Sequence, residues 1–139
     1  MRQQDFNDLP NFTYTEVLNH FILNGFSLEQ ARIEVKRLSK DWFLKLQKVR
    51  TQINQPIKIN CLTEGTHQPA SYHYKALAGD WHIPGIFQPN KVLQACLDAG
   101  FTGIGWYPHW NSPGFHTDTR PGGVKLWTRN QDGQYLGLI

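Results

Sequence analysis

The sequence predicts an α+β fold, with N-terminal helices packed on a small antiparallel sheet. In the first third of the chain, apolar residues recur at three- and four-residue steps, a spacing typical of helices. Beyond residue 56, short segments alternate apolar and polar residues, as half-buried strands do. The predicted order is helices, strand, loop, helix and then several strands. The 139 residues are enough for one hydrophobic core, so we expect a single domain spanning 1–139.

Two capping signals mark the starts of the N-terminal helices. "TYTE" at 13–16 and "SLEQ" at 27–30 have the capping-box form, in which a hydroxyl accepts from a backbone N–H three residues on and the Glu or Gln reaches back. Gly25 separates the two segments, and Gln55-Pro56 ends the second helix. The second segment carries an apolar stripe, which favours a face packed on a sheet over a coiled-coil seam. The stripe consists of Leu28, Ala31, Val35, Leu38, Trp42, Leu46 and Val49.

The remaining elements are predicted from alternation and turn residues. "IKINCL" at 57–62 alternates as a half-buried strand. A short helix at 89–100 is expected to take Asn90 as its N-cap and to end at Gly100. Turn-rich segments separate the strands after this helix, which we expect to form an antiparallel meander. These strands are predicted at 101–107, 114–120, 124–129 and 135–139.

Charge and cysteine content narrow the class of protein. The formal net charge of +3 favours polyanionic surroundings, without choosing between nucleic acid and an anionic cell-wall polymer. Cys61 and Cys96 match no cysteine-rich zinc pattern, and we expect both to be reduced and buried. The polar start predicts no secretory signal, and no apolar run is long enough to span a bilayer. We therefore expect synthesis in the cytoplasm without membrane insertion, and release by another agent if the protein acts on the cell wall.

Three side chains of metal-binding type form the main functional signal. His73, Asp80 and His116 supply two imidazoles and one carboxylate, which suit zinc with one position left for water. Small residues between His73 and Asp80 let the backbone pass close to an ion. Strand alternation places Asp118 on the same face as His116. From spacing alone, histidines that merely pack in the core remain the more common explanation.

The residues around these three resemble a known family. "SYHYKALAGDWHIPG" (71–85) resembles the Ser-x-His-x-x-Gly-x-Ala-x-Asp motif of the zinc D-Ala-D-Ala carboxypeptidases, which belong to the hedgehog-type metallopeptidases. "AGFTGIGWYP" and "GFHTDTRPGGVKLW" resemble two later strands of that family, and "LQKVRTQINQPIKI" resembles the helix and strand before the motif. The similarity covers about 42–128 in the right order and leaves extra N-terminal helices at 1–40 outside it.

The resemblance implies a hedgehog/D-Ala-D-Ala peptidase fold in which His73, Asp80 and His116 hold Zn2+. It further implies hydrolysis of peptide bonds in peptidoglycan stem peptides or cross-links, by a carboxypeptidase or an endopeptidase. The chemistry agrees, because zinc polarises a carbonyl and lowers the pKa of water towards ~7. A lone catalytic domain without a signal fits a lysin of phage or prophage type. The expected partner is a peptidoglycan peptide.

The chain departs from the family pattern at three places. The family glycine three residues after the first histidine is Ala76, which is tolerated unless this position needs a positive φ. The family's upstream Arg has no counterpart before Ser71. Family bases three or two residues before the last ligand are replaced by Pro113 and Gly114.

Candidate bases nearby are Asp118, His109 and Glu64, of which Asp118 is favoured because it shares a strand face with His116. The alternative for Asp118 is to orient a ligand imidazole or to pair with Arg120.

Other residues are candidates for contact with substrate, namely Ser71, His82, Tyr107 and Trp110. His82 is equally well explained as a loop histidine without a task, and His20 and His67 are given no site role. The aromatic content of a basic chain also fits stacking on single-stranded nucleic acid, but no Lys/Arg-rich strand supports it, so no nucleic-acid partner is expected. The alternative to an enzyme is a non-catalytic binding or structural module, such as a phage virion component, that keeps the fold and the metal.

Overall fold

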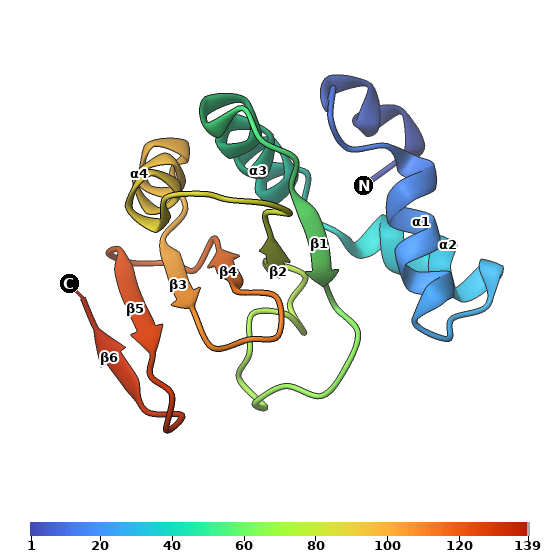
Figure 1. Ribbon diagram of the computed structural model, residues 1–139. Helices are drawn as coiled ribbons and strands as arrows, with labels where there is room; N and C mark the ends of the chain where they lie inside the picture. Colours follow the sequence, from blue (N-terminus) through green and yellow to red (C-terminus); the bar gives the residue numbers. More distant parts are fainter. Residues whose placement is uncertain (139) are drawn as a thin grey trace.

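A six-stranded sheet with strand order β1-β2-β4-β3-β5-β6 forms the centre of the computed structural model, which describes residues 1–138 (Figure 1). The predicted α+β class is confirmed. The strands are β1 (Lys58–Cys61), β2 (Ala78–His82), β3 (Gly103–Tyr107), β4 (Gly114–Asp118), β5 (Lys125–Arg129) and β6 (Tyr135–Gly137). The predicted last strand ends at residue 139, which lies outside the described residues.

The expected antiparallel meander is wrong in one respect, because β5 pairs with β3 in parallel. The other neighbouring pairs are antiparallel, so the sheet is mixed. Strand β2 pairs with the outer side of β4 and occupies the edge that a meander would give to β5. The chain after β4 therefore crosses the end of β3 through Pro121, Gly122 and Gly123 and adds β5 on the far side of β3.

The helices are the short 3₁₀ helix η1 (Gln3–Asp8), α1 (Tyr14–Leu23), α2 (Leu28–Arg37), α3 (Lys40–Ile53) and α4 (Pro89–Ala99). Ser27 makes the complete capping box predicted for α2. Thr13 caps α1 by accepting from the Glu16 N–H, without a return bond from the Glu16 side chain.

Two expectations about the helices are wrong. The apolar stripe does not follow one helix, because Leu38 is extended and Ser39 begins α3 as a new N-cap. At α4 the N-cap is Gln88 and not Asn90, since Pro89 takes the first helical position, where its missing N–H costs nothing. Gly100 ends α4 in the left-handed conformation, as predicted.

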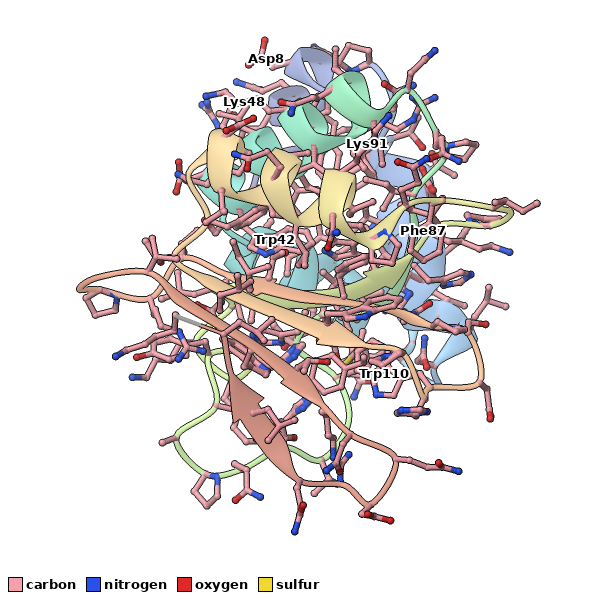
Figure 2. The ribbon with its side chains drawn as sticks, turned by 60° about the vertical axis from the view of Figure 1, so that its left-hand side comes forward. Asp8, Trp42, Lys48, Phe87, Lys91 and Trp110 are labelled. Carbon is pink, nitrogen blue, oxygen red and sulfur yellow. The ribbon has the colours of Figure 1, made fainter. Side chains whose placement is uncertain are left out.

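Helices α3 and α4 cover one face of the sheet, and the long segment between β1 and β2 runs beneath the other face (Figures 1 and 2). Trp42 of α3 lies between the two layers and donates its indole N–H to the Thr117 carbonyl, at 2.9 Å. Trp81 and Phe115 face the same layer, and neither is exposed. Helices α1 and α2 pack together beside the β1 edge (Figure 1). Along each strand, the side chains that alternate with these core residues point to the face that no helix covers.

Gly79 is a point where the helix layer touches the sheet backbone. A Cβ at Gly79 would lie 2.3 Å from Cζ2 of Trp42. Gly79→Ala is therefore expected to lower the free energy of unfolding by about 1–3 kcal/mol, measured by urea denaturation, because the buried indole must move. Gly123→Ala is the matched control, since nothing lies within 4 Å of a Cβ built there. Equal stability of the two variants would contradict this contact.

Candidate metal centre

Five residues line up in one row across the sheet, from β1 to β5. The register places Cys61 opposite Asp80, Asp80 opposite His116, His116 opposite Gly105 and Gly105 opposite Trp127. Side chains directly opposite in an antiparallel pair have Cβ atoms roughly 4.5–5.5 Å apart. Asp80 and His116 are therefore neighbours because of strand pairing, although 36 positions separate them in the sequence.

Gly105 leaves room for the rings of Trp127 and Tyr107. A Cβ at this position would lie 2.6 Å from Nε1 of Trp127. Without that carbon, the indole of Trp127 lies beside the imidazole of His116, with ring centres 5.5 Å apart. The glycine-rich strand is therefore part of the site, because it sets the shape of the wall next to His116.

The third candidate ligand reaches the row from the loop between β1 and β2. His73 is buried, and its Nε2 lies 3.2 Å from Oδ1 of Asp80. Nδ1 of His116 lies 2.9 Å from the same oxygen. One donor atom from each of the three residues lies within 4.8 Å of the others. The structure thus brings together the three residues that the sequence predicted as ligands.

The outer hydrogen bonds of the two histidines decide which nitrogens face the centre. Nδ1 of His73 donates to the Leu62 carbonyl, and Nε2 of His116 donates to Oδ2 of Asp118, at 2.7 Å. The remaining nitrogens, Nε2 of His73 and Nδ1 of His116, both point at Asp80. Ligand histidines commonly bind a second partner in this way, which fixes the ring and its tautomer. Two imidazoles and a carboxylate so arranged fit the donor set of a catalytic zinc site.

The charges of the centre depend on burial and on these hydrogen bonds. Burial raises the pKa of Asp80, but hydrogen bonds from His116 and His73 outweigh it and lower the pKa to about 2. Burial lowers the pKa of His116, while its hydrogen bonds to Asp118 and Asp80 raise it to about 9. Without a metal, a cationic His116 therefore lies between two carboxylates. A metal ion held at this candidate site would replace that proton, so its binding would strengthen as the pH rises towards 9.

Asp118 supports His116 and does not face the pocket. Its carboxylate is fully buried, and Arg120 binds both oxygens, through Nε at 2.8 Å and Nη2 at 2.6 Å. Burial raises the pKa of Asp118, but hydrogen bonds from Arg120 and His116 outweigh it and hold the pKa well below its usual range. The geometry matches the role of orienting the ligand imidazole better than the role of general base.

A chain of hydrogen bonds connects helix α1 to the candidate ligand His73. Nε2 of His20 lies 2.6 Å from Oε2 of the buried Glu64, whose Oε1 accepts from the Leu62 N–H, at 2.7 Å. The Leu62 carbonyl in turn accepts from Nδ1 of His73. His20, to which sequence analysis assigned no site role, therefore holds the loop that orients the candidate ligand His73. Glu64, a candidate base, is engaged in the same chain.

Replacement of His20 by alanine should loosen this chain and weaken zinc binding. We expect the dissociation constant to rise about 10-fold, which is typical of the loss of an outer partner, with the fold retained. A competition titration with a chromophoric chelator measures the effect. His82→Ala is the control, because His82 bonds to Asn60, at 2.7 Å, and lies outside the chain. An unchanged zinc affinity in His20→Ala would show that α1 does not support the site.

Ala76 lies where the family carries glycine, and its backbone adopts the left-handed conformation. Its φ is 58°, in the left-handed region, which costs an alanine roughly 1–2 kcal/mol. Neighbouring bonds hold the segment in place: the Ala76 N–H donates to the His73 carbonyl, and Arg37 of α2 binds the Tyr74 carbonyl, both at 3.0 Å. The position does need a positive φ, and the N-terminal helices help to hold it.

A hollow of about 820 Å³ opens over the centre. Ser71, Tyr107 and Trp110 line it, as predicted for substrate contacts, and the rings of Tyr107 and Trp110 stack with centres 4.3 Å apart. The predicted substrate contact His82 and the candidate base His109 are not among its lining residues. His109 is exposed in the turn after β3, beside a separate hollow. The other lining residues include Tyr72, Arg120, Trp127, Arg129 and Tyr135.

Sequence reasoning missed Cys61 and His67 as neighbours of the centre. The ring of His67 stacks on His73, with ring centres 4.1 Å apart. Sγ of Cys61 lies 3.5 Å from Nε2 of His67. The spacing of six residues between a cysteine and a histidine was a weak signal, which only the fold of the loop makes meaningful. Both cysteines are free thiols, but Cys61 is half-buried and only Cys96 is fully buried.

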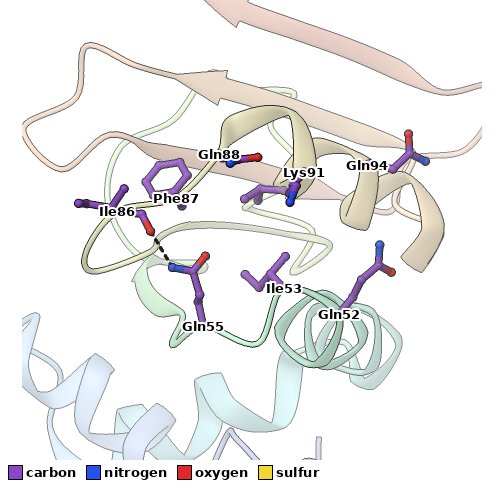
Figure 3. Close-up of a pocket in the computed structure, with 9 residues that line it drawn as sticks. Gln52, Ile53, Gln55, Ile86, Phe87, Gln88, Lys91 and Gln94 are labelled. Atoms are coloured by element: carbon purple, nitrogen blue, oxygen red, sulfur yellow. Dashed lines mark hydrogen bonds between the residues drawn. The ribbon is translucent and has the colours of Figure 1, made fainter.

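A second hollow, of about 520 Å³, lies between the end of α3 and the start of α4 (Figure 3). Gln55 donates there to the Ile86 carbonyl, at 2.8 Å. Its walls combine amide and apolar side chains with Lys91, and none of its lining residues belongs to a group of possible metal ligands. The possible metal ligands among the described residues therefore lie on the opposite face of the sheet.

Fold and centre together define an α+β protein with a candidate mononuclear metal site. Comparisons with protein-family models, with curated proteins and with solved structures find no match for this chain. Within residues 1–138, no helix combines the length and apolar character needed to cross a bilayer. The functional argument therefore depends on the geometry of the site.

Proposed function

We propose that the protein is a zinc-dependent hydrolase of peptide bonds in peptidoglycan stem peptides or cross-links. The observation that carries the proposal is the convergence of Nε2 of His73, Nδ1 of His116 and Oδ1 of Asp80, each imidazole oriented by an outer partner. These three residues would hold the ion. When bound, zinc supplies Lewis acidity, which polarises a carbonyl and lowers the pKa of water.

Two side chains in the hollow are suited to stabilise negative charge on a substrate carbonyl. The Tyr107 oxygen accepts from the indole N–H of Trp127, at 3.0 Å, which leaves its own hydrogen for a substrate. Burial raises the pKa of Tyr107 above its usual range, so the hydroxyl stays neutral and remains a donor. Arg120 adds a guanidinium that Asp118 holds in place. Donors fixed in this way stabilise charge that develops in a transition state.

The shape and charge of the hollow support a peptide substrate with carboxylate groups. The volume of about 820 Å³ suits several residues of a peptide. Aromatic walls offer apolar contact, while Arg120 and Arg129 supply positive charge. Stem peptides of the cell wall have free carboxylates that fit this charge. The motif around His73 and Asp80, which resembles the D-Ala-D-Ala carboxypeptidases, supports the same substrate class.

One observation favours the alternative of a binding module that keeps the metal. Among the described residues that line the hollow, Asp80 is the only carboxylate, and it is a proposed ligand. Asp118 and Glu64 are buried and engaged elsewhere, and His109 faces another hollow. The proton acceptor that hydrolysis needs thus has no carboxylate candidate, whereas binding of wall peptides needs none.

Turnover of purified cell wall distinguishes the two functions. The hydrolase should release soluble peptides, lose this activity with EDTA or in His73→Ala, and regain it when zinc is returned to the wild type. His109→Ala serves as the control and should keep its activity. Zinc binding and wall retention without release of fragments would establish the binding module instead. Cleavage that survives both EDTA and His73→Ala would remove the zinc mechanism.

A further inference from the structure

Three donor atoms face one another beside the proposed zinc centre, at the end of β1. Sγ of Cys61 lies 3.2 Å from the Glu64 carbonyl oxygen and 3.5 Å from Nε2 of His67. Nε2 of His67 lies 2.8 Å from the same carbonyl oxygen. The three atoms thus form a small triangle of sulfur, nitrogen and oxygen, and Cys61 and His67 are both half-buried.

The size of this triangle suits a metal ion. A point equidistant from the three atoms lies about 1.9 Å from each in their plane, so an ion slightly out of the plane reaches the ~2.0–2.3 Å bond lengths of zinc. A tetrahedral ion with one thiolate and one imidazole ligand separates their donor atoms by roughly 3.5 Å. Cys61 and His67 already have this separation, whereas the Glu64 carbonyl oxygen lies closer to both and would move outward by about half an ångström to complete tetrahedral angles.

We propose that Cys61, His67 and the Glu64 carbonyl form a second cation site, which takes a thiophilic ion such as Cd2+, Co2+ or zinc in excess. The sulfur ligand sets it apart from the His73–Asp80–His116 centre, which has only nitrogen and oxygen donors. This site does not use His116 and does not depend on the proposed hydrolase function.

The two sites are close enough to affect each other. Cys61 lies opposite Asp80 in the sheet, and the His67 ring stacks on His73. One donor atom each of Cys61, His67 and His73 lies within 4.8 Å of the other two. An ion at Cys61 therefore places a second positive charge next to the first, and zinc in excess is expected to inhibit whatever activity the first ion supports.

The competing explanation is that the thiol and the imidazole N–H only donate hydrogen bonds to the Glu64 carbonyl. Cys61→Ser separates the two explanations, because a hydroxyl keeps the hydrogen bond and loses the affinity for soft ions. Cys96 offers a matched control, since it is a free thiol buried in α4 away from the site.

The experiment is a titration of the metal-free protein with Co2+ under reducing conditions, followed by near-ultraviolet absorption, where thiolate-to-cobalt charge transfer gives a distinct band. We expect two ions per chain and a thiolate band in the wild type. Cys61→Ser should bind one ion and lose the band, and His67→Ala should weaken the band. Cys96→Ser should keep it. His116→Ala should also keep the band, so this result does not depend on whether the proposed zinc centre binds an ion.

Unfolding curves of the metal-free variants show whether each is folded before the titration. A wild-type protein that binds one ion without a thiolate band would overturn the second site. A band that persists in folded Cys61→Ser would equally overturn it, because the sulfur would then come from elsewhere.

Discussion

Substitution of His116 by alanine is expected to weaken zinc binding more than 100-fold, beyond the range typical for loss of an outer partner. The change removes Nδ1, which lies 2.9 Å from the shared oxygen of Asp80, and leaves His73 and Asp80 as the only proposed ligands of that centre. It also removes the imidazole that separates the carboxylates of Asp80 and Asp118. Isothermal titration of the metal-free protein with Zn2+ measures the affinity.

His109→Ala is the control for this experiment, because His109 is an exposed histidine of the β3–β4 turn that does not line the hollow over the centre. It should bind zinc with unchanged affinity. The Co2+ titration of His116→Ala adds a second check, because the second cation site should still fill. Wild-type zinc affinity in His116→Ala would show that His73, Asp80 and His116 do not act together, and the proposed hydrolase would lose its basis.

The three candidate ligands could be selected from the sequence for local reasons. Asp80 and His116 lie in short strands where alternation decides which face each side chain takes, and the same rule places Asp118 behind His116. His73 lies in an irregular loop, and only the resemblance of its flanking residues identified it. The structure adds the pairing of Asp80 with His116, because strand order depends on contacts that no local pattern encodes.

The errors in the fold prediction share one cause, which is that a local pattern has more than one tertiary solution. The stripe from Leu28 to Val49 fits one helix, yet Ser39 is also a good N-cap and starts a second one. The strand at β5 fits an antiparallel meander, but its edge on β4 was already taken by β2. Cys61 and His67 carried no recognisable motif, and their proximity follows only from the loop that returns to β2.

Replacement of Asp118 by asparagine is expected to have the second large effect, on stability as well as on the metal. Oδ1 of Asp118 accepts from Nε and the backbone N–H of Arg120, and Oδ2 accepts from Nη2 of Arg120 and from His116. Asparagine has the same shape but exchanges one oxygen for an NH₂ group. Either orientation of the amide then points a donor at another donor, and it leaves the guanidinium without a counter-charge.

We therefore expect Asp118→Asn to lower the free energy of unfolding at pH 7 by about 3 kcal/mol, the lower end of the range for breaking a buried ion pair. Zinc affinity should fall about 10–100-fold, because a neutral amide is a poorer acceptor for the His116 N–H than the carboxylate. Urea denaturation of the metal-free protein and zinc titration measure the two effects. Asp132→Asn, in the exposed turn between β5 and β6, should leave both unchanged.

The pH dependence of the free energy of unfolding tests whether the lost charge of Asp118 causes the destabilisation. The pKa of Asp118 is held well below its usual range, so its contribution to stability is fully present above the unfolded pKa of about 3.9 and is lost as the pH falls through the lower, folded value. The stability difference between wild type and Asp118→Asn should therefore shrink as the pH falls below 4. A difference that stays constant down to pH 2 would assign the loss to the mismatched hydrogen bonds of the amide, and not to the buried charge.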